Sequence, residues 1–291
     1  MLNPTSALRI GILTGLLITL CAKASDFQSP RTIGLGGAGH ASPLFTDAIY
    51  LNPSYIPMLP VYALSLNYLW FDAGQIATSP GTTDNYRHDL NFSFQNGNRE
   101  APVQFGAGYT LRESYSLIHL AAAKSFGDGK FSVGLGSKVI LPDDPSAAKT
   151  LDGSLSFSAI LSEGFRASLI FDNLFNAAQD RGFVSEYILG TKWSIASFFQ
   201  LYLDPHLYPT LSSDPSHWGY EMGAELPFLE NFSFRMGGFN NSMISYQTQR
   251  GDGFGLGLGW LTPLFSFDIG LSKTTQPISA FAESLQITFC F

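Results

Sequence analysis

The final stretch of the chain, Phe281–Phe291, alternates between apolar and small polar side chains. The apolar positions are Leu285, Ile287, Phe289 and Phe291, and the polar positions are Ser284, Gln286, Thr288 and Cys290. A period of two is the pattern of a β-strand whose two faces meet different surroundings. Because the sequence stops on an aromatic residue of the apolar face, the pattern favours a lipid-facing strand that closes a barrel over an ordinary half-buried strand.

The composition of the chain points the same way. Charged residues make up 13% of the sequence and aromatic residues 14%, with a formal net charge of −7. The charged share is about half of that in soluble domains. No segment after residue 24 is an apolar run of helix-spanning length, so alternating strands are the remaining way to cross lipid. The negative net charge predicts no nucleic-acid partner.

Residues 1–24 have the features of a secretory signal peptide. Arg9 supplies the positive start, Ile10–Leu20 is an apolar run too short to span a bilayer, and Ala22-Lys23-Ala24 is a cleavage motif. A lipoprotein signal is not expected at Cys21, because the preceding residue is a leucine rather than a small one. The signal predicts export from the cytoplasm. Removing it would leave Cys290 as the single cysteine, so no disulfide within the chain is expected.

Residues 61–291 divide into about fourteen alternating segments, an even number as single-chain barrels have. The expected strands are Tyr62–Phe71, Asp89–Gln95, Val103–Leu111, Tyr115–Phe126, Lys130–Leu141, Leu151–Leu161, Phe165–Phe171, Val184–Ile195, Phe198–His206, Trp218–Leu226, Phe232–Phe239, Phe254–Trp260, Phe265–Leu271 and Phe281–Phe291. We therefore predict an all-β fold, a transmembrane antiparallel β-barrel. Parity places Leu155 toward lipid and Ser156 toward the lumen, where an arginine should be tolerated far better.

The lengths of the connections support a barrel over a soluble sandwich. With both chain ends on the inner side, the connections alternate between long and short, as in outer-membrane barrels. The longest outer connection is Asp72–Arg87, and Arg112–Ser114 is the only short one expected on that side.

Residues 25–60 do not read as strands. They contain Gly34-Leu-Gly-Gly-Ala-Gly39, followed by Asp47-Ala-Ile-Tyr-Leu-Asn-Pro53. A nucleotide-binding glycine loop is not expected, because no strand precedes the glycines and no Lys-Ser/Thr follows. Together the two motifs resemble the N-terminus of the FadL-type (OMPP1/FadL/TodX) outer-membrane transport family, which includes a PorV-like branch. The turn Asn52-Pro53-Ser54 departs mildly from the family's Asn-Pro-Ala.

The resemblance implies that residues 25–60 form a hatch inside a fourteen-stranded barrel. It also implies passive uptake of small hydrophobic, fatty-acid-like compounds across the bacterial outer membrane. The C-terminus resembles the signal read by the outer-membrane assembly machinery, with Phe289 and Phe291 as its aromatics. The expected partners are outer-membrane lipid, that machinery and a hydrophobic small molecule. The hatch and ligand residues would be Gly34, Gly36, Gly37, Gly39, Asn52, Pro53, Ala63, Leu69 and Phe71.

The polar face of the predicted strands carries charges of both signs, which either pair with one another and with the hatch or line a pore. Gly253, Gly255, Gly257 and Gly259 leave a bare strip that makes room for the hatch or a ligand, or allows tight curvature. The histidines lack metal-ligand spacing, so no metal or cofactor is expected. A phospholipase site would need a histidine and a serine together on the outer face, and His119 points inward. The chain is therefore not expected to be an enzyme. A PorV-like docking barrel and a general diffusion porin remain the alternatives to hydrophobic uptake.

Overall fold

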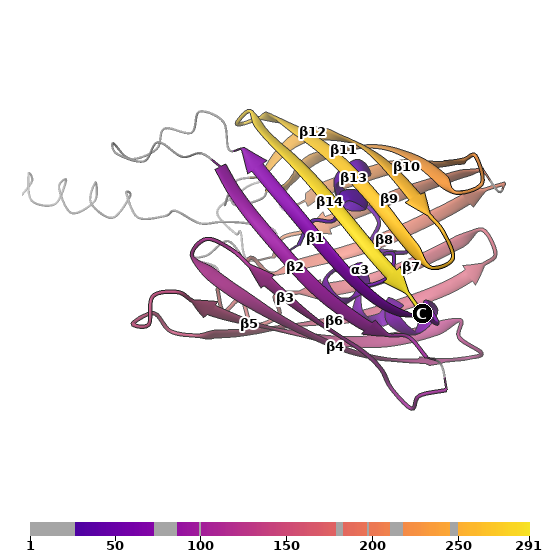
Figure 1. Cartoon of the computed structure of the whole chain (residues 1–291), viewed down its shortest axis with the longest axis horizontal. Coiled ribbons are helices and arrows are strands. Elements are labelled where there is room, and N and C mark those ends of the chain that lie inside the picture. Colours follow the sequence, from indigo (N-terminus) through magenta and orange to yellow (C-terminus); the bar gives the residue numbers. More distant parts are fainter. Residues whose placement is uncertain are drawn as a thin grey trace, which may run out of the picture.

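The structure is a computed structural model that describes residues 27–72, 86–98, 100–178, 183–196, 198–209, 218–244 and 250–291. The expected signal peptide lies outside these residues. The described chain forms fourteen strands in one closed barrel, in which each strand pairs with its neighbours in sequence and β14 pairs antiparallel with β1 (Figure 1). The predicted strand number and closure are thus confirmed.

The strands are β1 (Tyr62–Asp72), β2 (Tyr86–Asn96), β3 (Gln104–Leu111), β4 (Tyr115–Phe126), β5 (Phe131–Pro142), β6 (Thr150–Ser162), β7 (Phe165–Asp172), β8 (Glu186–Ile195), β9 (Phe199–Leu207), β10 (Trp218–Phe228), β11 (Phe232–Met243), β12 (Arg250–Leu261), β13 (Phe265–Gln276) and β14 (Ala280–Cys290). Several are longer than expected, most clearly β11 to β13. Their pairing continues past register shifts at Phe239/Ser242 and Asp252/Gly253. A bulge breaks the alternation of side chains, so the sequence pattern stops before the strand does.

The two faces of the wall have the polarity that the alternation predicts. On β14, Leu285 and Phe289 are 44% and 51% exposed, whereas Thr288 between them is completely buried. The final Phe291 follows β14, and its amide donates to the carbonyl oxygen of Tyr62 at 2.9 Å. The terminal residue is therefore held at the seam between the first and last strands.

Leu155→Arg tests the assignment of the lipid face. Leu155 lies on β6 beside Ser156, and its side chain belongs to the apolar outer set. An arginine on the lipid face costs about 2–4 kcal/mol near the bilayer midplane. We expect the variant to lose stability of that order in urea unfolding from lipid vesicles, while Leu155→Phe changes it little. Equal unfolding curves for the two variants would mean that the assigned face is wrong.

The expectation that an arginine would be tolerated at Ser156 is wrong, although the side chain does point into the lumen. Ser156 is completely buried, and its hydroxyl accepts a hydrogen bond from the Ser54 amide at 2.8 Å. The lumen at this height is filled by the N-terminal segment rather than by water. An arginine here would have to displace that segment.

The connections of the barrel are uneven in length. β1, β7 and β9 end, and β2, β8 and β10 begin, at the end of the barrel opposite the C-terminus, which we call the loop end (Figure 1) and where long stretches of sequence separate these strands. Two connections at this end are short, residues 112–114 as expected and residues 277–279, because β13 and β14 extend further than predicted. The alternation of loop lengths is real but weaker than the sequence suggests.

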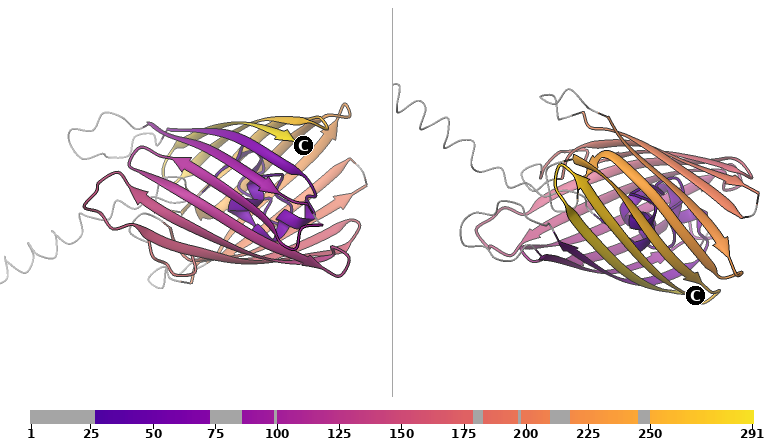
Figure 2. Two further views of the ribbon diagram at one scale, coloured as in Figure 1. Left: turned by 60° about the horizontal axis from the view of Figure 1, so that its bottom comes forward. Right: turned by 90° about the horizontal axis from the view of Figure 1, so that it is seen from above.

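Residues 27–61 lie inside the barrel (Figure 2), and we call them the lumen segment. The segment contains α2 (Pro30–Gly34), α3 (Asp47–Leu51) and the 3-10 helix η1 (Pro53–Met58). It passes from a cavity near the loop end, where Phe27 and Gln28 lie beside Asp172 and Met243, to the start of β1. The described N-terminal residues therefore do not lie at the C-terminal end as assumed. No helix in the described part of the chain is long and apolar enough to cross a membrane.

Candidate functional site

The lumen segment lies backbone against backbone on the wall formed by β11 and β12. A Cβ atom added to Gly255 would lie 1.8 Å from the Ile33 carbonyl oxygen, and one added to Gly237 would lie 2.1 Å from the Leu35 carbonyl carbon. Gly34 would meet the Cα atom of Gly257 at 2.9 Å. The glycines at these wall positions therefore make room for α2 and the turn after it.

Only part of the glycine strip of β12 lies against the lumen segment. A Cβ at Gly259 would meet the Arg235 guanidinium at 2.5 Å, and one at Gly253 would meet the Phe239 ring at 2.4 Å. The two outer glycines thus accommodate neighbouring side chains of the wall. The expectation of a strip that makes room for the N-terminal segment holds for Gly255 and Gly257.

Three of the predicted site glycines have backbone conformations that side chains disfavour. Gly36, Gly37 and Gly39 have φ values of +66°, +93° and +127°. A Cβ at Gly37 would also lie 2.3 Å from the carboxyl carbon of Glu221. The Gly34–Gly39 motif therefore combines a tight turn with close approach to the wall and to a buried carboxylate.

Asn52 and Pro53 attach the second half of the segment to β6 and β7. Asn52 is completely buried, and its side-chain amide is 2.8 Å from the His40 carbonyl oxygen and 3.0 Å from the Ser158 and Ser168 hydroxyls. Pro53 begins η1, whose backbone occupies the space left by Gly134. The polar face of β6, with its small serines, is thus the surface on which this turn rests.

Buried ion pairs join the first half of the segment to the wall. Arg31 Nη2 lies 3.0 Å from Glu225 Oε2 and 2.7 Å from the Tyr202 hydroxyl. Arg235 then bridges Glu225 Oε1 at 2.7 Å and Asp268 Oδ1 at 2.5 Å. Lumen charges thus pair with one another and with the segment, which is one of the two arrangements expected from the sequence.

Asp47 carries the only side-chain carboxyl group of the lumen segment. Its Oδ1 accepts a hydrogen bond from the Gln286 amide at 3.0 Å. A buried hydrogen bond thus also joins the segment to β14.

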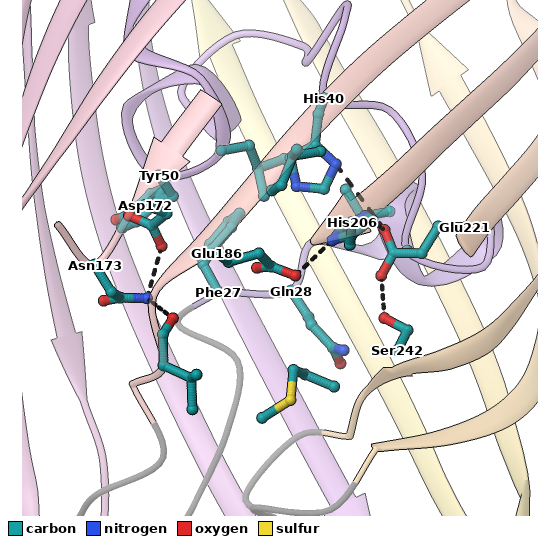
Figure 3. A pocket seen from close by; sticks show the side chains of 16 residues that line it. Phe27, Gln28, His40, Tyr50, Asp172, Asn173, Glu186, His206, Glu221 and Ser242 are labelled. Carbon is teal, nitrogen blue, oxygen red and sulfur yellow. Dashed lines mark hydrogen bonds and ion pairs between the residues drawn. The ribbon is translucent and has the colours of Figure 1, made fainter. Parts of the chain in front are cut away.

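A polar cavity of about 90 Å³ lies between the segment and the loop end (Figure 3). His40 reaches it from the segment, and Glu186, His206 and Glu221 reach it from β8, β9 and β10. The His40 ring lies beside Asp204, whose Oδ2 is 2.9 Å from its Nδ1.

Sequence reasoning missed this group, because its members are far apart in the chain and are brought together only by closure of the barrel around the segment. The parity of the strands was the available signal. His206 and Glu221 both occupy lumen-facing positions of paired strands, with His206 opposite Gly219 in the register.

Comparison with known proteins places this geometry among solved barrels. No protein-family model and no curated protein matches the sequence. The structure is similar to the CymD monoaromatic hydrocarbon channel, with a TM-score of 0.64 and 13% identity over 93% of this chain and 97% of CymD. This chain has the FadL-type barrel fold.

Two further FadL-type barrels show the same likeness. The Ralstonia pickettii toluene transporter TbuX has a TM-score of 0.63 and 13% identity, covering 93% of this chain and 98% of that one. A Pseudomonas aeruginosa FadL homologue has a TM-score of 0.60 and 12% identity, covering 92% of this chain and 99% of that one. The resemblance therefore extends over the whole barrel.

The three predicted ligand residues of the first strand do not form one site in this FadL-type barrel. Leu69 and Phe71 are buried in the lumen and pack with Ile33 of α2. Phe71 borders a cavity of about 30 Å³. Ala63 is buried as well, but near the other end of β1, where it pairs with Cys290 and Gln95. The apolar side chains of Leu69 and Phe71 therefore pack against the segment.

Proposed function

We propose that this chain is a bacterial outer-membrane barrel for the passive uptake of small hydrophobic compounds, gated by the lumen segment. The observation that carries the proposal is a lumen filled by residues 27–61, in a barrel with the fold of CymD and TbuX. Those proteins are described as a hydrocarbon channel and a toluene transporter. We infer the same class of substrate, a small apolar molecule, for this chain.

The filled lumen argues against a general diffusion porin. Three cavities beside the segment in the described part of the chain measure about 90, 30 and 10 Å³. An apolar cavity that binds benzene measures about 150 Å³. A monoaromatic molecule therefore needs the segment to move before it can pass.

An apolar groove of about 530 Å³ on the lipid-facing side supports a hydrophobic substrate. Leu201, Leu203, Met222 and Met236 are among the side chains that line it. At its floor, Gly223 and Gly237 place no side chain between the groove and the lumen, and Leu35 of the segment lies directly behind both. A compound bound in the groove is thus separated from the segment by one layer of backbone.

The docking-barrel alternative is favoured by one observation. Arg31 of the segment is tied into the buried network of Glu225, Arg235 and Asp268. A segment held by buried charge pairs is costly to displace, because a lone buried charge is left behind. A permanently plugged barrel would use its outer surface rather than its lumen.

Deletion of residues 25–60 separates these functions. A gated transporter should become a leaky channel, with single-channel conductance in planar bilayers well above that of the full chain. Purified full-length barrel should also carry hydrophobic molecules that mass spectrometry of a lipid extract identifies. The deletion variant must first show a strand-dominated circular dichroism spectrum and resist unfolding in cold SDS, so that loss of the barrel is not read as loss of gating.

Other results would favour the alternatives. Large conductance in the full chain would identify an open porin. If neither form conducts and the extract contains no hydrophobic molecule, the docking function is the better explanation than uptake.

A further inference from the structure

We propose that His40, His206 and Glu221 form a binding site for one divalent transition-metal ion of the zinc class, which ties the lumen segment to the wall. One donor atom of each residue lies within 4.8 Å of the donors of the other two. The three side chains converge on the cavity at the loop end (Figure 3). Two imidazoles and one carboxylate are a ligand set that zinc uses in proteins.

All three ligand side chains are buried. His40 and Glu221 are each 8% exposed, and His206 is 2% exposed. His206 Nε2 lies 3.1 Å from Glu221 Oε2, but neither atom has a hydrogen-bond partner of good geometry. Two ligands on one tetrahedral zinc ion are about 3.3 Å apart. Unpartnered buried polar atoms are costly, and a shared cation would satisfy both of them.

Each ligand is oriented by a second group. His206 Nδ1 lies 2.5 Å from Glu186 Oε1, which leaves Nε2 as the free ring nitrogen. Ser242 donates to Glu221 Oε1 at 2.5 Å, which leaves Oε2 free. Carboxylates that hold the far nitrogen of a ligating histidine are the usual outer partners of metal sites.

His40 is also held by a carboxylate of the wall. Asp204 Oδ2 lies 2.9 Å from His40 Nδ1, the ring nitrogen that also lies 4.0 Å from Glu221 Oε2, and accepts hydrogen bonds from the backbone amides of Gly39 and His40 at 2.8 and 2.9 Å. Asp204 Oδ1 also accepts the Thr191 amide at 3.1 Å. The ring is therefore fixed beside the cavity by a carboxylate that is already fully bonded.

The charge of the group also calls for a cation. Glu186, Asp204 and Glu221 bring three carboxylates together, and among the described residues their ion pairs are all with the two histidines. With neutral imidazoles the cluster carries three negative charges. A divalent ion on His40, His206 and Glu221 would offset two of them, and a water molecule from the cavity would complete four-coordination.

The inference goes beyond the proposed function, and its test does not require transport. Full-length barrel in detergent is stripped with a chelator, and Zn²⁺ binding is measured by competition with a chromogenic chelator. We expect one Zn²⁺ per chain, bound in the micromolar range or tighter. Co²⁺ in its place should give the visible absorption of a four-coordinate site. A chain that binds neither ion below 1 mM would overturn the proposal.

Variants test which residues bind the ion. His206→Gln and His40→Gln should each weaken Zn²⁺ binding at least a hundredfold, and Glu186→Gln, which changes only an orienting group, about 10–100-fold. The matched control is His119→Gln, since His119 is another buried lumen histidine whose ring nitrogens have no hydrogen-bond partner in the described structure.

The control variant should bind within twofold of the wild type. Each variant is first checked for the folded form in cold SDS. Equal losses in His119→Gln and His206→Gln would overturn the assignment. Should the ligand variants fail to fold, the Co²⁺ spectrum of the wild type still decides it, because a spectrum of six-coordinate cobalt would contradict a buried site with these ligands.

Discussion

Arg235→Met is expected to destabilise the barrel by about 3–5 kcal/mol, the cost of removing one partner of a buried ion pair. The Arg235 side chain is 3% exposed and contacts Glu225 and Asp268, which would remain as two buried carboxylates without it. Glu225 would keep Arg31 of the lumen segment, whereas Asp268 would lose its partner in the network. The measurement is urea unfolding of the barrel from lipid vesicles.

Arg87→Met provides the matched control. Arg87 pairs with Glu113 at 3.3 Å, but the two side chains are 32% and 44% exposed. A surface pair of this kind contributes about 0–1 kcal/mol. If both methionine variants unfold at the same urea concentration as the wild type, the network does not hold the segment in place.

Gly237→Ala is expected to push the lumen segment off the wall. The new methyl carbon would lie 2.1 Å from the Leu35 carbonyl group and 2.5 Å from the Gly36 nitrogen, both of them backbone atoms that cannot rotate away. Overpacking of this kind costs about 1–3 kcal/mol. Because the segment closes the lumen, the variant should show raised single-channel conductance and faster proteolysis of residues 27–61.

Gly238→Ala is the control for this change, one residue further along the same strand. The nearest atom to its new methyl group is the Gly253 carbonyl oxygen at 3.4 Å, an ordinary contact. It should behave as the wild type in both assays. Equal conductance in the two alanine variants would show that contact with Gly237 does not control the position of the segment.

The barrel was predictable because each of its strands carries its own signal. Side chains of β14 and β1 alternate strictly, so period, face and strand number could be read from the sequence one segment at a time. Bulges in β11 and β13 concealed where those strands end at the loop end, because one inserted residue reverses the parity. The resemblance of Gly34–Gly39 and Asn52-Pro53 to the FadL-type N-terminus also led to the correct fold.

The candidate site was less predictable, because it depends on contacts across the lumen. Nothing near His40 in the sequence indicates that its side chain contacts Asp204 and Glu221, which belong to β9 and β10 of the barrel wall. Counting histidine spacings along the chain could not find such a cluster. The same limit explains Ser156, since its inward direction was predictable but the presence of Ser54 against it was not.

The position of the lumen segment has a consequence for how the protein is assembled. The segment runs directly into β1, and β1 pairs on one side with β2 and on the other with β14. The seam that closes the wall is therefore attached to the part of the chain that fills the interior. Closure of the wall encloses residues 27–61, whose buried charges and amides need their partners once water is excluded. Folding of the lumen segment must therefore be coordinated with closure of the wall during insertion into the membrane. A barrel with an empty lumen does not have this requirement.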